Sequence, residues 1–155
     1  MTKKQLREHC DAEFENIYRV TSELTAVVQS RNSDYPIAEL AAIATFIHNC
    51  YNGIENILKR ILYFEKKELK DGPTWHKELL KSASAAGIIT DDLYAELSNY
   101  LSFRHFFVHA YSFTLRWDDL KPLAVNLDLV LSKFNAAISA YMEKQEPGAT
   151  RSKES

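Results

Sequence analysis

Hydrophobic residues recur every three or four positions along most of the chain, the spacing typical of amphipathic helices. The first run predicts a helix from about residue 3 to 30, and the second predicts one that ends near residue 67. We expect Asp34 to cap the second helix, with Pro36 in its first turn. The predicted inward-facing residues are Leu6, Cys10, Phe14, Ile17, Leu24, Val27 and Val28 in the first helix, and Leu40, Ile43, Ala44, Ile47, Tyr51, Ile54, Ile57, Leu58, Ile61 and Leu62 in the second.

Gly53 lies in the middle of the second predicted helix. A helical glycine costs about 1 kcal/mol relative to alanine, so its presence needs a reason. A close contact with another helix or a bound ligand would supply one, and we expect close packing.

Three more helices follow. Thr74 can cap a short helix from about residue 75 to 86, which Gly87 ends. Thr90 opens a fourth helix that carries Leu93, Leu97 and Leu101, and helical periodicity is lost after Tyr111. A last helix begins near Asp118 and Pro122 and runs to about residue 144.

These elements predict an all-α fold, a bundle of four long helices and a shorter one. We expect one domain over residues 1–144 and a polar, disordered tail over residues 145–155. The chain has 155 residues with 46% hydrophobic and 26% charged, the composition of one soluble domain.

Cys10 and Cys50 stand within helical patterns without a CxxC spacing, which predicts two reduced, buried thiols. We find no secretory signal and no apolar stretch of about 18 residues, so we expect a cytoplasmic protein without a membrane partner. The formal net charge of −2 argues against a protein that coats DNA. It leaves room for an enzyme that contacts a few phosphates through a local patch.

Residues 100–113 read YLSFRHFFVHAYSF, and apolar side chains surround this helix on more than one side. One side would meet the bundle, and the other needs a partner chain or a groove. Arg104, His105 and His109 are the polar residues set into it. At about 100° per residue, His105 and His109 share a face, whereas Arg104 and His109 lie about 140° apart. A two-fold partner that presents the same segment would let Arg104 and His109 form one cleft.

Histidine exchanges protons near neutral pH, and arginine binds phosphate. Together they suit RNA cleavage without a metal, in which a base activates a 2′-OH and an acid protonates the leaving oxygen. ExxH and HExxH motifs are absent from the sequence, and we expect no metal or cofactor. A structural bundle, in which this segment serves only as a dimer contact, remains an alternative.

Arg104 and His109, with His105 directly after the arginine, resemble the R-polar-x3-H signature of the HEPN ribonucleases. Tyr111 extends the pattern to R-x4-H-x-Y, which looks like the HepT toxins of toxin–antitoxin pairs. The stretches YNGIENILKR (residues 51–60) and WHKELL (residues 75–80) are also similar to HepT-like sequences. The resemblance covers about residues 5 to 142.

This resemblance implies a HEPN-like bundle that forms a two-fold dimer and a metal-independent endoribonuclease toxin that cuts tRNA or mRNA. Arg104 and His109 match the catalytic pair, and His105 matches a supporting polar position. Tyr111 matches the tyrosine that a partner antitoxin, a minimal nucleotidyltransferase of the MntA type, modifies with AMP. The added bulk and negative charge could block the cleft and compete for Arg104.

The rival is a helical binding subunit without catalytic activity that docks a minimal nucleotidyltransferase. Among the remaining polar residues, Glu55 could pair with Arg104 or, equally well, with Lys59 one turn along its own helix. His76 could cap or pack, and neither His9 nor His48 has a partner visible in the sequence.

Overall fold

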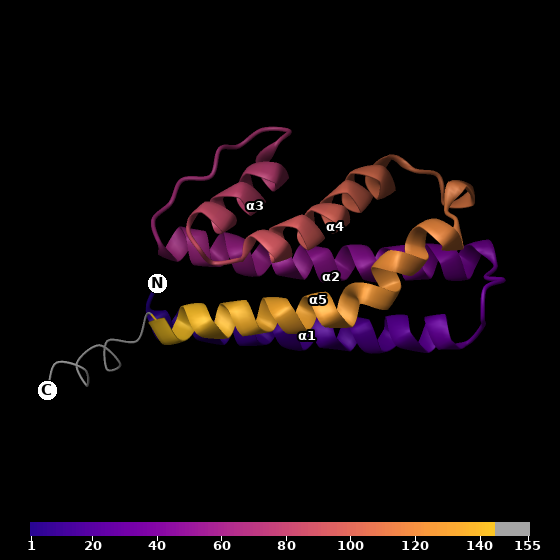
Figure 1. Ribbon diagram of the computed structural model, residues 1–155, viewed down its shortest axis with the longest axis horizontal. Coiled ribbons are helices and arrows are strands. Elements are labelled where there is room, and N and C mark those ends of the chain that lie inside the picture. The colour runs from indigo at the N-terminus through magenta and orange to yellow at the C-terminus, as the bar shows by residue number, and fades with distance from the viewer. Residues whose placement is uncertain (145–155) are drawn as a thin grey trace, which may run out of the picture.

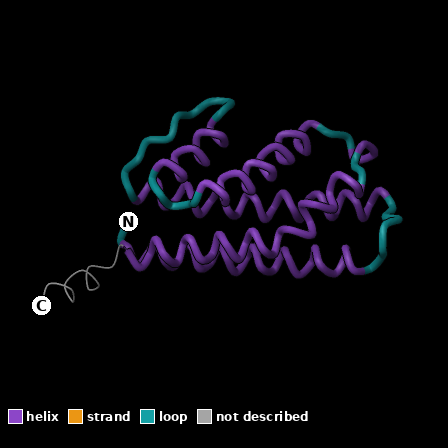
Figure 2. Tube along the Cα trace, in the orientation of Figure 1, coloured by secondary structure: helices purple, strands orange, loops and turns teal. Residues whose placement is uncertain are grey.

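The computed structural model describes residues 1–144, so the expectation about the tail lies outside the described residues. The helices are α1 (Lys3–Gln29), α2 (Ile37–Phe64), α3 (Trp75–Ala85), α4 (Asp91–His109) and α5 (Trp117–Lys144), with a short 3-10 turn, η1 (Ser112–Thr114). Residues 1–144 contain no strand (Figure 2). In Figure 1, α1, α2 and α5 run lengthwise, and α3 and α4 lie along the other side of α2. The predicted all-α bundle of four long helices and a shorter one is confirmed.

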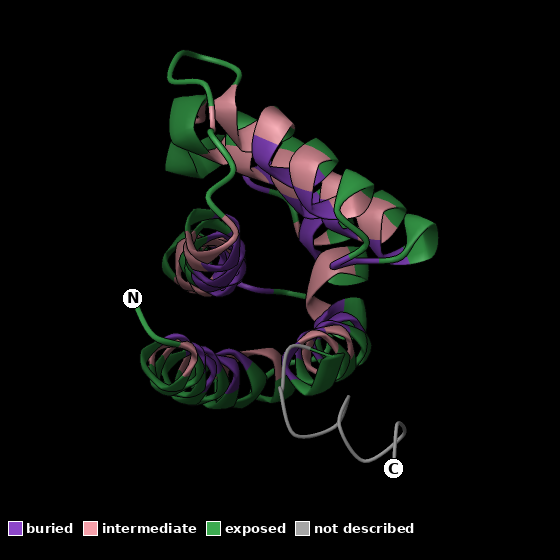
Figure 3. Cartoon of the chain, turned by 90° about the vertical axis from the view of Figure 1, so that its left-hand side faces the viewer, coloured by how far each residue is buried: buried purple, intermediate pink, exposed green. Residues whose placement is uncertain are grey.

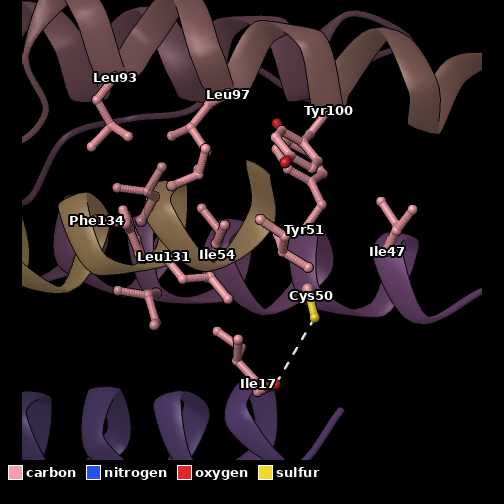
Figure 4. Close-up of a cluster of buried hydrophobic side chains, with 14 of the residues drawn as sticks. Ile17, Ile47, Cys50, Tyr51, Ile54, Leu93, Leu97, Tyr100, Leu131 and Phe134 are labelled. Atoms are coloured by element: carbon pink, nitrogen blue, oxygen red, sulfur yellow. Dashed lines mark hydrogen bonds between the residues drawn. The ribbon is translucent and has the colours of Figure 1, made fainter. Parts of the chain in front are cut away.

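Helix α2 lies in the middle of the bundle and is buried along most of its length. Its two neighbouring layers, α1 with α5 and α3 with α4, turn their buried sides toward it (Figure 3). Figure 4 shows its inward residues meeting side chains from all of α1, α4 and α5, among them Ile17, Leu97 and Phe134. All ten inward positions predicted for this helix are buried.

Three predicted caps can be compared with the structure. Thr90 caps α4 as expected, because its side chain accepts a hydrogen bond from the Leu93 N–H. The expectation for Asp34 is wrong, since Pro36 occupies the N-cap of α2 and no side chain caps it. Thr74 stands at the N-cap of α3 but makes no side-chain hydrogen bond, because its backbone has ψ 12° instead of the extended value that aims a capping side chain.

Tyr35 organises the turn that Asp34 was expected to organise. Its ring is 7% exposed, and its hydroxyl donates to the carbonyl oxygens of Val28 and Arg31 at the end of α1. The same ring packs against Trp117 at the start of α5, with 4.6 Å between ring centroids. A buried aromatic residue therefore joins the α1–α2 turn to α5.

Gly53 marks the closest approach of α1 and α2. A Cβ at this position would lie 2.5 Å from Cγ1 and 2.7 Å from Cδ1 of Ile17, closer than any stable contact. The expectation of close helix packing is therefore confirmed. Cys50, one turn earlier, places its Sγ 3.9 Å from the Ile17 carbonyl oxygen (Figure 4).

Both cysteines are free and buried, as expected. Burial raises the pKa of the Cys10 thiol to about 12, assisted by Asp11 and Glu13, and burial likewise raises the pKa of Cys50 to about 12. Because the thiolate is the reactive form, both side chains act as small apolar residues.

Helix α5 supports the end of α4. The Tyr100 hydroxyl donates a 2.7 Å hydrogen bond to the Leu123 carbonyl oxygen. Pro122 lies inside α5, in its sixth position, where a proline removes one backbone hydrogen bond. In Figure 1 the first turns of α5 slant away from η1 before the rest runs alongside α1.

By length and mean hydropathy α5 could also cross a membrane, which contradicts the expectation that no stretch is long and apolar enough. One such helix is weak evidence, because the core helices of many proteins pass the same test. Seven of its residues, from Leu120 to Met142, are buried in the bundle.

We expect Gly53→Ala to destabilise the protein by about 1–3 kcal/mol, because the new methyl group would overlap Ile17 by more than the alanine helix preference can offset. Urea unfolding measures the change. In an Ile17→Ala background the overlap is gone, so Gly53→Ala should become neutral or stabilising. Additive effects of the two substitutions would contradict close packing at this point.

Candidate active site at the end of the fourth helix

Helix α4 ends at His109, and the segment of interest spans this end. Ala110 and Tyr111 adopt extended backbone conformations, with ψ values of 148° and 145°. Residues 104–109 are therefore helical, whereas Tyr111 stands in an extended link that leads into η1. The helix end sets different surroundings for the candidate residues.

His105 and His109 lie one above the other on the exposed side of α4. Their ring centroids are 5.3 Å apart with the rings edge to face. Both side chains are exposed. This pairing is the one that the helical spacing predicts.

Arg104 points to the other side of α4, toward α2. Its side chain is half-buried, and its Nε is buried without a hydrogen-bond partner among the described residues. Its positive charge lowers the pKa values of both His48 and Glu55 on α2. Within the described chain no hydrogen bond or ring contact joins Arg104 to His109, in keeping with the divergence expected on one helix.

Glu55 is the centre of a buried polar cluster between α2 and α3. Its side chain is 3% exposed, and His76 Nδ1 lies 2.9 Å from each of its carboxylate oxygens. The alternative pairing with Lys59 is not observed, because Lys59 Nζ lies over the Trp75 ring, 4.6 Å from its centroid. We define the polar cluster as Glu55, His76, Arg104, Tyr51 and His48.

Burial dominates the electrostatics of this cluster. Burial raises the pKa of Glu55, although the hydrogen bond from His76 and the charges of His76 and Arg104 act in the opposite direction. Burial and Arg104 lower the pKa of His48, which favours a neutral imidazole. Neutral His48 packs against Phe107, with ring centroids 5.1 Å apart, and its Nε2 has no partner in the described residues.

His48, Tyr51 and Glu55 were not assigned to the site from the sequence. Their spacing of three and four residues places them on one face of α2, and that signal was available. Their proximity to Arg104 and His76 was not, because it depends on how three helices pack. His9 lies elsewhere, on α1 beside the end of α2.

An exposed apolar surface surrounds the end of α4. Phe106 is 45% and Val108 47% exposed, and beyond the helix Tyr111 is 72% and Phe113 69% exposed. The last two rings stack in parallel, with centroids 5.5 Å apart and 9° between planes. The side of this segment that was expected to need a partner is thus open in the single chain.

Within residues 1–144 no group of three His, Cys, Asp or Glu side chains comes together that could hold a metal ion. The arrangement instead offers a phosphate-binding cation, Arg104, and a pair of solvent-facing imidazoles.

The fold and this site define the class first: an all-α bundle with Arg104 and His109 at the end of α4 is a HEPN-type protein. A family model described as HepT-like protein matches residues 42–145, about two thirds of the chain. The chain therefore belongs to the HepT-like family. This family consists of HEPN-type toxins of toxin–antitoxin systems. No curated protein and no solved structure shows significant similarity to the chain.

The buried Glu55 predicts a distinct pH dependence of stability. Because its native pKa is raised, the folded protein holds this proton more tightly than the unfolded chain does. Its contribution therefore favours folding below the ordinary glutamate pKa and is lost as pH rises through the raised value. We expect Glu55→Gln to flatten the fall in unfolding free energy over that range, measured by urea unfolding at several pH values. The exposed Glu15→Gln should leave the pH profile unchanged, and an equal effect of both substitutions would contradict the assignment.

Proposed function

We propose that the protein is the toxin of a toxin–antitoxin pair and cuts RNA as a metal-independent endoribonuclease. Arg104 binds the scissile phosphate, and His109 transfers protons. Oxygen 2′ of the ribose attacks the adjacent phosphorus, the bond to the 5′-oxygen breaks, and the leaving oxygen receives a proton. His105, stacked on His109, supports it.

The observation that carries this proposal is the buried, unpartnered Nε of Arg104 beside the polar cluster. A buried guanidinium nitrogen without a partner is costly, and an anionic ligand would satisfy it. Phosphate is the anion that arginine binds best, through paired hydrogen bonds.

The catalytic unit is a two-fold dimer. Arg104 and His109 point to different sides of α4, so one chain does not bring them to the same phosphate. A second copy packed on the apolar surface of Phe106, Val108 and Phe113 would bring Arg104 of one chain toward His109 of the other. The same arrangement explains why these apolar side chains are exposed in a single chain. The protein would act in the cytoplasm, where RNA is available.

We expect His109→Ala and Arg104→Ala each to reduce RNA cleavage by about 100-fold or more, because each removes a group that acts on the reacting phosphate. Gel assays with tRNA and mRNA, and growth of cells that express each variant, measure the loss. Circular dichroism should show an unchanged helix content.

Arg116→Ala is the matched control for Arg104, because it removes an exposed arginine beyond the end of α4. It should retain activity, and His105→Ala should lose only part of it. A fully toxic His109→Ala variant would rule out the ribonuclease assignment. A pure dimer that binds a nucleotidyltransferase but never cuts RNA would favour the non-catalytic binding subunit.

Control by AMP addition at Tyr111 is the second part of the proposal. The Tyr111 oxygen attacks the α-phosphorus of ATP, pyrophosphate leaves, and the phenolic proton is released. The exposure of this side chain and its extended backbone make it accessible to a modifying enzyme. The resulting phosphodiester would lie two residues from His109.

Co-expression with a minimal nucleotidyltransferase of the MntA type should add AMP to the chain and abolish its toxicity. Mass spectrometry of the intact protein and its peptides checks both the mass and the position. Tyr111→Phe keeps the ring and its stacking on Phe113 but offers no acceptor, so it should remain toxic and unmodified. AMP found on Tyr111→Phe would place the modification elsewhere.

A further inference from the structure

A second candidate site lies away from residues 104–111, at the end of the bundle where α1 begins and α2 ends (the end that faces the viewer in Figure 3). A cleft of about 1340 Å³ opens there between α1, the last turns of α2 and the loop before α3. None of its lining residues belongs to the candidate active site or the polar cluster. We call it the basic cleft.

Positive charge is concentrated in the basic cleft, although the whole chain has a net charge of −2. Five of its lining residues are cations, namely Lys59, Arg60, Lys66, Lys67 and Lys70. Three are carboxylates, namely Glu13, Glu68 and Asp71. Within residues 1–144 none of the five cations forms a salt bridge, so their charge is not neutralised locally. A concave surface with excess positive charge focuses an attractive field on anions.

The end of α2 adds to this field by hiding its own negative end. The Lys66 and Lys67 N–H groups donate to the carbonyl oxygens of Tyr63 and Leu62, in hydrogen bonds of 3.0 and 2.9 Å. These bonds form a Schellman cap, whose central residue is usually glycine. Here that residue is Lys66, with a φ of 57°, the only positive φ at a non-glycine residue among the described residues. A lysine is thus held in a conformation that glycine would adopt at lower cost.

An aromatic residue stands among these cations. Tyr63 is 70% exposed, so one of its faces is free for stacking. Trp75 also lines the cleft, but Lys59 lies over its ring. Cations interleaved with an exposed aromatic ring are typical of surfaces that bind single-stranded nucleic acid, where phosphates meet the cations and bases stack.

The basic cleft borders the polar cluster around Arg104. Asn56 in the cleft follows Glu55 directly along α2. Trp75 in its wall packs on His76, with ring centroids 3.6 Å apart, and His76 binds Glu55. A strand held in the cleft would therefore lie next to the elements that position Arg104.

We propose that the basic cleft binds the backbone of single-stranded RNA outside the scissile position, with Lys66 and Lys67 contacting phosphates and Tyr63 stacking on a base. The choice of RNA as the ligand rests on the proposed ribonuclease function. The cleft sets affinity for long RNA, and the chemistry remains at Arg104 and His109.

The test measures binding separately from cleavage. In the His109→Ala background, fluorescence anisotropy with a long single-stranded RNA compares Lys66→Glu/Lys67→Glu with Lys77→Glu/Lys81→Glu. The second pair carries the same charge change on exposed positions of α3 that do not line the cleft. We expect the first pair to weaken binding about tenfold or more and to reduce the salt dependence by about 0.7 in log–log slope per lost phosphate contact. The second pair should bind like its parent.

Lys66→Gly separates binding from folding. Glycine suits the positive φ, so the melting temperature should equal or exceed that of the parent while RNA binding weakens. In the active protein, the same substitution should slow cleavage of long RNA at low concentration and leave cleavage of a short oligonucleotide unchanged.

Each remaining outcome is decisive. Equal binding by the parent and Lys66→Glu/Lys67→Glu would overturn the proposal, as would equal losses in both charge-reversed pairs. Unchanged RNA binding together with loss of a protein partner would identify a protein-docking surface instead. Should His109→Ala still cut RNA, the proposed function would fail, while the binding comparison would still decide the role of the cleft.

Discussion

The burial of α2 is the constraint on which the rest of the structure depends. This helix is covered by α1 and α5 on one side and by α3 and α4 on the other, so each polar group on it must find a partner inside the protein. Gly53 lets α1 approach closely enough to complete one side. On the other side, Glu55 cannot reach water and instead binds His76. The positions of α3 and α4 follow from these two contacts.

The same constraint gives Arg104 and His109 different surroundings on one helix. Arg104 faces α2 and adjoins a buried cluster whose charges are balanced by neighbours. His109 faces solvent, where a histidine can gain and lose a proton freely. A rigid, buried cation and a solvent-facing base suit opposite requirements of phosphoryl transfer, which needs both fixed charge and mobile protons. One chain holds these two groups apart, and two chains can combine them.

The sequence predicted the helices well because the apolar spacing is regular from Leu6 to Ile138 and because few glycines interrupt it. It misplaced the start of α2, since Asp34 is a good capping residue by type but Tyr35 determines the turn through its buried ring. Within the site, the pairing of His105 with His109 follows from helical spacing alone. The contact of Glu55 with His76 joins residues 21 positions apart on different helices. Such contacts depend on the packing of helices, and periodicity along the chain contains no information about it. The five cations of the basic cleft were missed for the same reason.

The two buried cysteines have a consequence for experiments on this molecule. Cys10 and Cys50 are packed against the α1–α2 contact and have raised pKa values, so thiol reagents would meet no reactive native sulfur while the fold is intact. A single cysteine introduced on an exposed helix position could then be labelled selectively without first replacing the native residues. Dyes placed this way on two copies would report the distance between chains by energy transfer. The packing that closes the core thus also leaves the surface chemically silent, ready to carry a probe of assembly.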